Sequence, residues 1–208
     1  MRSAIILAGG SSKRMNGDKG RLLLGGEPVI QHTYNRLSER VDEVIVIVHT
    51  QEQLTKYRNI LCEAEIVVDI GEGSSPILGA STGLMYAQGE YAFMAGHDMP
   101  FINLEIVDRL FTLAESHDGA TPLWPNGYIE PLHAVYHVKK AFATARKLLE
   151  KDEKRLRMIL RTLPDIKFLL IEEIQNIDRN LVTLFDIDDE KDLIEARRIW
   201  QIKSHTDP

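Results

Sequence analysis

Residues 7–19 have the sequence LAGGSSKRMNGDK, in which glycines, hydroxyl side chains and three positive charges follow an apolar run. Gly9 and Gly10 carry no Cβ atom, so a ligand can approach their backbone closely. Arg14 and Lys19 supply cations, and backbone amides combined with cations form a binding site for anions. The alternative is a solvated turn, where glycine, serine and lysine are also common. We interpret the segment as a phosphate-binding loop, although it matches neither the P-loop nor the dinucleotide-binding pattern.

Asp98 also has a chemical signature, because it follows the apolar run of residues 91–96 almost directly. Mg²⁺ takes oxygen ligands and keeps several waters, so one or two carboxylates together with phosphates suffice to hold it. The neighbouring His97 is a poorer ligand for this ion, and we expect it to have a structural role. Asp98 could instead be a turn residue before Met99 and Pro100. The sequence favours Asp98 as a ligand of Mg²⁺, and a second ligand must come from elsewhere in the chain.

Zinc or disulfide chemistry is not indicated. Cys62 is the single cysteine, so it cannot form an internal disulfide or a cysteine-rich zinc site. We expect it to be a small buried apolar side chain. His133 and His137 are four residues apart, but they lie in a run that reads as a strand, and no third ligand accompanies them.

Composition limits the partners of the chain. It has 208 residues, a formal net charge of −6 and no basic stripe, so nucleic acid is not expected as its main partner. No stretch approaches the roughly 18 apolar residues of a membrane span, and no secretory signal is apparent. We therefore expect a cytoplasmic protein that forms a single domain over residues 1–208.

Strand-like and helix-like periods alternate along the first half of the chain. Continuous apolar runs predict strands at residues 3–8, 43–48, 65–69 and 91–96. Apolar spacing predicts helices at residues 29–37, 54–61 and 103–114, the last with Asn103 as its N-cap. Runs this apolar are typical of parallel strands that are buried on both faces. The alternation predicts an α/β fold, a Rossmann-like three-layer αβα arrangement around a mostly parallel sheet.

The second half is less regular. Further strands are predicted at residues 119–124, 132–138, 166–171 and 182–187, a charged helix at 139–161 and a final helix at 190–200. The glycine segment and Asp98 both follow predicted strands, and open α/β sheets bind ligands at the carboxyl ends of their strands. We expect the two to lie in one crevice.

These motifs resemble those of a known family. LAGGSSKRMNGDK resembles the L-A-G-G-x-S-x-R-M-G-x-D-K signature of the molybdenum cofactor guanylyltransferases, within the GT-A-like nucleotidyltransferases. VVDIGEGSSPILGASTGL is similar to that family's aspartate-containing strand and G-P-L-x-G segment, and GHDMPFI to its C-D-M-P-F motif. IEPLHAVY resembles its Q-P-L-x-A-L-Y strand, and LFDIDDEKDL its F-x-N-I-N-T-P-E-D-L ending. The resemblance spans nearly the whole chain in the right order.

The resemblance implies a role for each matching residue. Arg14 and Lys19 would neutralise the triphosphate and the departing pyrophosphate. Asp69 would help to hold the base or ribose, and Asp98 would ligate Mg²⁺. Backbone contacts to the nucleotide would come from Leu7, Ala8, Gly9 and Gly10.

The resemblance also places the second metal ligand at Asp188, which matches the second Asn of the family's N-x-N. The alternative is that this aspartate caps the last helix, since Asp is favoured at helix starts. Both can hold if Asp188 ligates the metal and Asp189 caps the helix. The choice between Asp186 and Asp188 as ligand stays open.

The activity that the resemblance implies is transfer of GMP from GTP to the phosphate of a molybdopterin-type acceptor. Residues 1–100 would form the nucleotide-binding half and residues 101–208 the acceptor-binding half. Open alternatives are CTP with molybdopterin, or an NTP with a cobinamide phosphate or sugar phosphate. A non-catalytic nucleotide sensor is a different class, against which the joint presence of Arg14, Lys19 and Asp98 argues. The sequence does not indicate the oligomeric state.

This chain departs from the family pattern at several positions. Asn16-Gly17 replaces the usual Gly-x before Asp-Lys, and His97 stands where Cys is common. Asp186 and Asp188 replace two Asn residues, which makes the expected metal site more acidic. No required charge is lost, so these departures affect the identity of the substrate more than the type of reaction.

Overall fold

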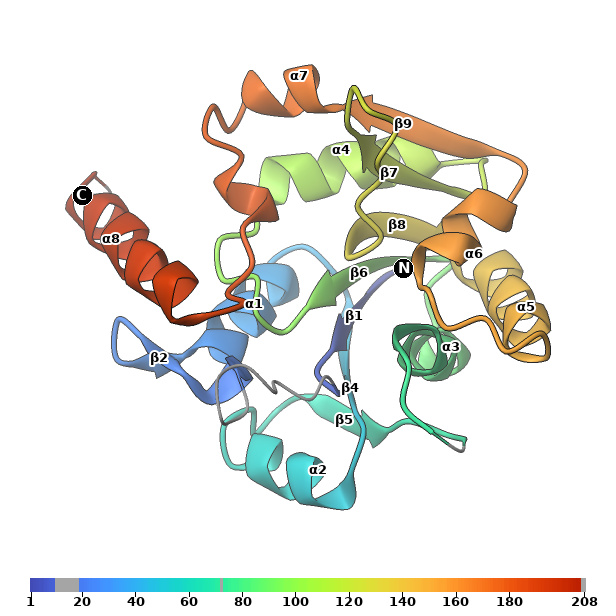
Figure 1. Cartoon of the computed structure of the whole chain (residues 1–208), viewed down its shortest axis with the longest axis horizontal. Helices are drawn as coiled ribbons and strands as arrows, with labels where there is room; N and C mark the ends of the chain where they lie inside the picture. The colour runs from blue at the N-terminus through green and yellow to red at the C-terminus, as the bar shows by residue number, and fades with distance from the viewer. Residues whose placement is uncertain (10–18, 72, 207–208) are drawn as a thin grey trace.

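Seven strands form one sheet in the order β5-β4-β1-β6-β8-β7-β9 (Figure 1). The computed structural model describes residues 1–9, 19–71 and 73–206. The strands of the sheet are β1 (Arg2–Leu7), β4 (Glu43–Val48), β5 (Glu65–Val68), β6 (Tyr91–Gly96), β7 (Gly119–Leu123), β8 (His133–His137) and β9 (Ile166–Leu170). Strand β8 runs antiparallel to β6 and β7, and the other pairings in the sheet are parallel. The prediction of a mostly parallel sheet is confirmed.

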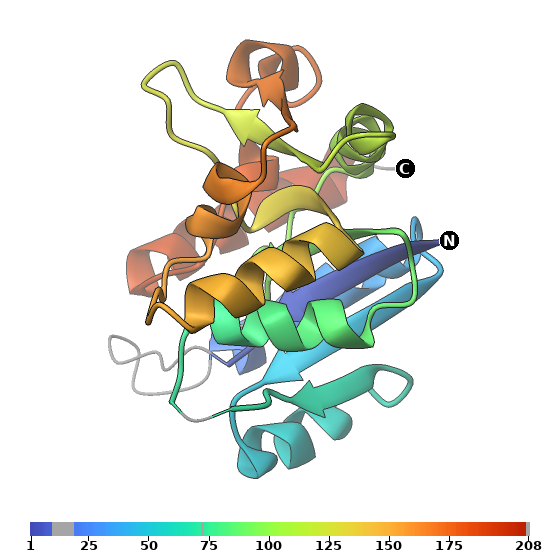
Figure 2. The ribbon, with the colours of Figure 1, turned by 90° about the vertical axis from the view of Figure 1, so that its right-hand side faces the viewer.

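Helices cover both faces of this sheet. They are η1 (Lys19–Arg21), α1 (Val29–Ser38), α2 (Gln51–Arg58), α3 (Pro76–Tyr86), α4 (Leu104–Ala114), α5 (Val138–Leu149), α6 (Arg157–Thr162), α7 (Ile171–Gln175), η2 (Val182–Leu184) and α8 (Glu190–Thr206). The helices α3, α5 and α6 pack on one face, and α3 and α5 lie side by side in Figure 2. The helices α1, α2, α4 and α7 pack on the other face. The expected three-layer αβα arrangement is therefore confirmed.

Alternation along β1 shows how the sequence builds the two layers. Ala4 and Ile6 belong to the core on one face of the sheet, and Ile5 belongs to the core on the other. All three side chains are fully buried. A strand buried on both faces needs a continuous apolar run, which is the pattern that predicted it.

A smaller apolar cluster fixes the C-terminal helix. Leu193 and Ala196 of α8 pack there with Leu24, which lies in the short hairpin of β2 (Leu23–Leu24) and β3 (Glu27–Pro28). The ring of Trp200 lies 4.5 Å from that of His32. The helix continues to Thr206, beyond its predicted end.

In the part of the chain that the structure describes, no helix has the length and apolar character to cross a membrane.

The helix predicted at residues 139–161 is broken into two. Helix α5 ends at Leu149, and Asp152 has φ of 56°, a left-handed conformation that a helix cannot continue through. The carboxylate of Glu153 then accepts hydrogen bonds from the backbone of the next two residues. Local turn chemistry therefore interrupts an apolar pattern that by itself favours one helix.

The strand predicted at residues 182–187 is also absent, since η2 and an irregular segment replace it. Thr183 is buried, and its hydroxyl accepts a hydrogen bond from the backbone of Asn103. Asn103 itself is the N-cap of α4, as predicted. Single contacts to other elements therefore hold this segment in place, and it does not form the repeated backbone hydrogen bonds of a β-strand.

The expected burial of Cys62 is wrong, because this thiol is exposed. Helix α2 ends at Arg58, and in the turn that follows it is Leu61 that enters the core.

Candidate active site

Strands β1 and β6 are neighbours and end at the same edge of the sheet, where Leu7 pairs with Gly96. Asp98 follows β6 in the turn at this edge. The glycine segment leaves β1 here, and the described chain resumes at Lys19, the first residue of η1. Lys19 and Asp98 therefore lie together at the edge of the sheet where the strand ends predicted them.

Lys19 joins two of the predicted carboxylates. Its Nζ donates a hydrogen bond to Oδ1 of Asp188 and lies 3.5 Å from Oδ2 of Asp98. The side chains of Lys19 and Asp98 are only 13% and 14% exposed, whereas that of Asp188 is 55% exposed. One side of the group is thus enclosed by protein, and the other side is open.

A backbone contact brings the C-terminal segment to this place. The N–H of Ile187 donates to the carbonyl of Asp98 at 3.0 Å, and the Ile187 side chain is fully buried. Asp189 caps α8, because its Oδ1 accepts from the backbone N–H groups of Lys191 and Asp192 at 2.7 and 3.1 Å. The capping role therefore falls to Asp189, and the carboxylate of Asp188 faces Lys19.

Burial and neighbouring charges shift the pKa values of Asp186 and Lys19. Burial raises the pKa of Asp186 to about 6, and repulsion from the carboxylates of Asp98 and Asp188 adds to the shift. Burial alone would lower the pKa of Lys19, but its hydrogen bond to Asp188 and the charge of Asp98 leave it raised. Negative charge therefore exceeds positive charge here, which favours the binding of a cation.

The donor atoms suit Mg²⁺. Two carboxylates, Asp98 and Asp188, converge on one point, and the ammonium of Lys19 occupies the place of a cation between them. No group of three His, Cys, Asp or Glu side chains in the described ranges is arranged to hold a metal. Two carboxylate ligands supplemented by phosphate oxygens and water are nevertheless typical of Mg²⁺ sites.

A second polar pair lies farther along the same edge. Asp69 follows β5, and its carboxylate contacts Nδ1 of His49 at 3.1 and 3.3 Å. Burial raises the pKa of Asp69, while the hydrogen bond to His49 opposes that shift. His49 directly follows β4. Asp98 was identified because it follows a predicted strand, and the same criterion could have found His49, but it was missed.

At the carboxyl end of β1, some backbone groups form hydrogen bonds within the protein. The N–H of Ala8 donates to the carbonyl of Ile47 at 2.7 Å, and the carbonyl of Leu7 lies 3.1 Å from Nδ1 of the buried His97. This contact gives His97 the structural role expected for it. At Gly9 a Cβ atom would lie 3.2 Å from Cβ of His49, so the glycine permits close packing of the two strand ends.

Two of the predicted residues, Gly10 and Arg14, lie outside the described residues. The predicted charged residues that are described form two groups along the edge, with Lys19, Asp98 and Asp188 in one and Asp69 in the other, and Leu7, Ala8 and Gly9 lie at the end of β1. The strand order separates β5 from β6 by three steps, or about 14 Å at the usual strand spacing. The groups therefore share an edge of the sheet without touching.

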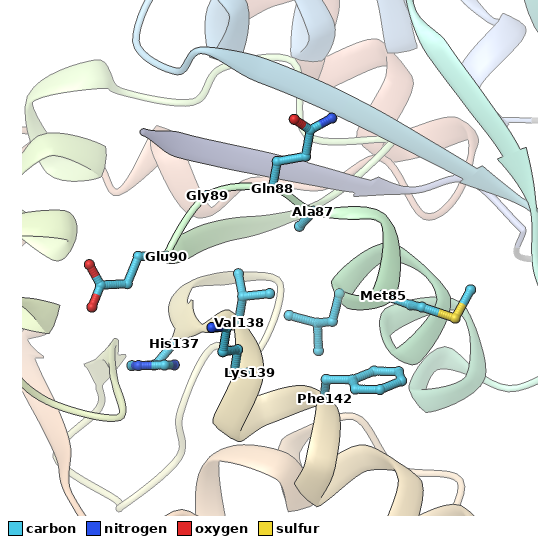
Figure 3. A pocket seen from close by; sticks show the side chains of 10 residues that line it. Met85, Ala87, Gln88, Gly89, Glu90, His137, Val138, Lys139 and Phe142 are labelled. Atoms are coloured by element: carbon cyan, nitrogen blue, oxygen red, sulfur yellow. The ribbon is translucent and has the colours of Figure 1, made fainter.

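A cavity of about 550 Å³ lies elsewhere, between the end of α3, the start of β6 and the start of α5 (Figure 3). Its lining includes Glu90, which precedes β6, and His137, which pairs with Tyr91. These residues are at the amino end of β6, whereas Asp98 follows its carboxyl end. The cavity is therefore separate from the candidate active site.

Known proteins are similar to this chain in sequence and in fold. The chain is 35% identical over 199 residues to the "Probable molybdenum cofactor guanylyltransferase" of Methanosarcina acetivorans, with coverage of 92% of this chain and 88% of the relative. It is 32% identical over 200 residues to the protein of the same name from Natronomonas pharaonis, with coverage of 94% and 96%.

A solved structure with the same fold is the molybdopterin-guanine dinucleotide biosynthesis protein A of Archaeoglobus fulgidus. It has a TM-score of 0.83 and 24% identity, and the match covers 97% of this chain and 100% of that one. The 4-diphosphocytidyl-2C-methyl-D-erythritol synthase of Anaerococcus prevotii has a TM-score of 0.71 at 18% identity, with 96% of each chain covered. The αβα fold is therefore that of the nucleotidyltransferases.

The family comparison agrees with the motifs and with the site. Residues 4–166 match the MobA-like NTP transferase domain, and this range includes Lys19, Asp69 and Asp98. The chain therefore belongs to the family of MobA-like NTP transferases.

Proposed function

We propose that this chain transfers GMP from GTP to the phosphate of a molybdopterin-type acceptor and releases pyrophosphate. The observation that carries the proposal is the convergence of Lys19, Asp98 and Asp188 at the carboxyl ends of β1 and β6. Family membership and the names of the curated relatives support the choice of substrates. We expect the reaction to take place in the cytoplasm.

The chemistry needs no nucleophile from the protein. An oxygen of the acceptor phosphate attacks the α-phosphorus of GTP, the bond from the α-phosphorus to the bridging oxygen breaks, and pyrophosphate leaves. Lys19 and Arg14 would neutralise the phosphates and hold them in line, and positioning and charge account for most catalysis of this kind. Asp98 and Asp188 would hold Mg²⁺. When bound, that ion supplies positive charge that offsets the negative charge on the phosphates.

The nucleoside would bind at the other group on the edge. Asp69 and His49 follow β5 and β4, and Leu7 to Gly10, at the end of the neighbouring strand β1, would contact the nucleotide through the backbone. Residues 1–100 supply β1, β4, β5 and β6 together with Asp98, so we assign nucleotide binding to this part. We assign acceptor binding to residues 101–208, which add β7, β8 and β9.

The test is to measure pyrophosphate release with molybdopterin and Mg²⁺ while the nucleotide is varied among GTP, CTP and ATP. We expect turnover with GTP to exceed that with the others, and we expect chelation of Mg²⁺ by EDTA to abolish it. Turnover with CTP but not with GTP would contradict the guanylyl assignment and retain the transfer chemistry. The absence of pyrophosphate release with any nucleotide would contradict the enzyme assignment itself.

A further inference from the structure

Glu130 is a half-buried carboxylate that the reaction described above does not use. Its Oε1 accepts a hydrogen bond from Nε1 of Trp124 at 2.6 Å. With the described residues its side chain makes no other hydrogen bond or ion pair, so Oε2 remains available as an acceptor. A partly desolvated carboxylate oxygen with no partner in the protein can accept a hydrogen bond from a bound ligand.

The backbone holds Glu130 at the catalytic edge of the sheet. His133, three residues later, pairs with Ala95 near the carboxyl end of β6, the strand that leads to Asp98. The carbonyl of Glu130 accepts from Oγ1 of Thr121 at 3.1 Å. The side chain of Glu130 therefore projects from a fixed backbone rather than from a free loop.

Tyr128 lies two residues before Glu130, and its backbone N–H donates to Oδ1 of Asn126 at 2.9 Å. The residue is 45% exposed, on the segment that precedes Glu130. Partial burial raises the pKa of Tyr128, the charges of Glu130 and Asp186 raise it further, and the charge of Arg157 lowers it. The Tyr128 side chain is therefore accessible on the segment that carries Glu130, and the charge of Asp186, two residues before Asp188, acts on its hydroxyl.

The strand order places Glu130 on the acceptor side of the reaction centre. From β5, next to Asp69, to β8, next to Glu130, there are four strand steps, or about 19 Å. Asp98 follows β6, the strand between them that neighbours β8. A nucleotide that extends from Asp69 toward Asp98 leaves the Glu130 side to the second substrate.

We propose that Glu130 binds the heteroaromatic ring of the acceptor by accepting hydrogen bonds from an N–H donor edge, with Tyr128 beside the ring. The inference rests on the proposed function. The ring class is a 2-amino-4-oxopteridine, whose adjacent ring N–H and amino group present two parallel donors to a carboxylate. An acceptor that offered only oxygen acceptors to Glu130 would be repelled, so the residue selects for the ring as well as holding it.

The first test compares Glu130→Ala and Glu130→Gln with the wild type. Glu130→Ala should raise KM for molybdopterin by about tenfold or more, because a bond to a charged group is lost, and leave KM for GTP within about twofold. Glu130→Gln keeps the size and one acceptor oxygen, so its effect should be smaller. Glu172→Ala on the exposed side of α7 is the matched control and should leave both constants unchanged. Equal loss of GTP and acceptor binding in a folded Glu130→Gln protein would overturn the proposal.

The second test needs no turnover. Binding of 6-hydroxymethylpterin and of 6-hydroxymethyllumazine, which has an oxo group in place of the 2-amino group, is measured by titration calorimetry. The wild type should prefer the pterin by about tenfold, and Glu130→Ala should lose that preference. Equal affinity of the wild type for both rings, or no binding of either at millimolar concentration, would overturn the proposal. A pterin preference in a protein that releases no pyrophosphate would contradict the proposed function and support the role of Glu130.

Discussion

The ammonium group of Lys19 lies between two carboxylates that would otherwise repel each other. This contact neutralises part of the negative charge of Asp98 and Asp188. The same ammonium group lies where we expect it to contact the phosphate oxygens of the nucleotide, so Lys19 belongs to the proposed nucleotide site.

We expect Lys19→Ala to weaken the binding of GTP. Loss of a charge-assisted contact to phosphate costs about 1.5–3 kcal/mol, or roughly 10- to 100-fold in affinity. Titration calorimetry with GTP and Mg²⁺ measures the change. Lys154→Ala, which removes an exposed lysine paired with Asp152, is the control and should bind GTP normally. A folded Lys19→Ala protein with unchanged affinity would exclude Lys19 from the nucleotide site.

We expect Asp98→Asn to lose nearly all transfer activity while the fold survives. Asn keeps the size and one oxygen but lacks the negative charge that a hard divalent cation prefers. The backbone contact of Asp98 to Ile187 does not depend on the side chain, so stability should stay close to that of the wild type. Pyrophosphate release and circular dichroism check the two parts. Near-normal activity of the variant would mean that Asp98 is only a turn residue.

At the scale of the element, α3 approaches β1 through glycine. A Cβ atom at Gly83 would lie far inside van der Waals contact of Cγ2 of Ile5, whereas at Gly79 the nearest side-chain atoms are 3.6 Å away. The two positions lie on the same helix and both are buried. They therefore separate the effect of close packing from the intrinsic preference of alanine for helices.

We expect Gly83→Ala to destabilise the protein by about 1–3 kcal/mol, since Ile5 lies in a fully packed core and must move. Gly79→Ala should be neutral or stabilising by up to about 1 kcal/mol, because alanine favours the helix more than glycine does. Urea unfolding of both variants gives the two free energies. Equal stability of the two would show that the close approach at Gly83 relaxes without cost.

The elements that could be predicted are those whose own sequence carries a pattern. Strands β4 and β6 begin and end at their predicted residues, because continuous β-branched and apolar runs are bounded by polar residues. Helix α3 was not assigned, because every residue from Ile77 to Leu84 is buried and no polar face marks its period. The segment 182–187 has a strand-like composition, but contacts with distant residues determine its conformation.

The residues of the candidate site also differ in whether their own sequence marks them or only contacts with distant residues do. Asp98 could be predicted because it adjoins a strand end that the sequence marks clearly, and Lys19 because it ends the glycine-rich segment that follows β1. His49 also follows a clearly marked strand and could have been predicted, whereas the pair of Trp124 and Glu130 depends on a contact through space that no pattern in the sequence marks. The position of Asp188 came from the resemblance, since its partner Lys19 is distant in the sequence.

At the scale of the whole molecule, His133 links stability to pH. It is 1% exposed, and burial lowers its pKa from 6.5 to about 3. Below about pH 6.5 the unfolded chain binds a proton at this residue while the folded chain does not, so stability must fall as the pH falls toward 3. The contribution of this histidine is fully retained above pH 6.5.

We expect the wild type to lose about 2 kcal/mol of stability between pH 8 and pH 5 through this residue. His133→Leu, which replaces the ring with an apolar group that does not titrate, should lose correspondingly less over the same interval. Urea unfolding at the two pH values measures both losses. Parallel losses in the two proteins would assign the acid sensitivity to other groups.

The chain order of the three residues that meet at the site matters for its synthesis. Translation supplies Lys19 when only β1 of the sheet has been made, and Asp188 after all seven strands. A nascent chain folds from its N-terminus, so it can assemble the sheet on the ribosome before the carboxylate opposite Lys19 has emerged. A sheet that forms during synthesis would therefore hold Lys19 and Asp98 before Asp188 joins them, so the proposed metal site would be completed only after the sheet.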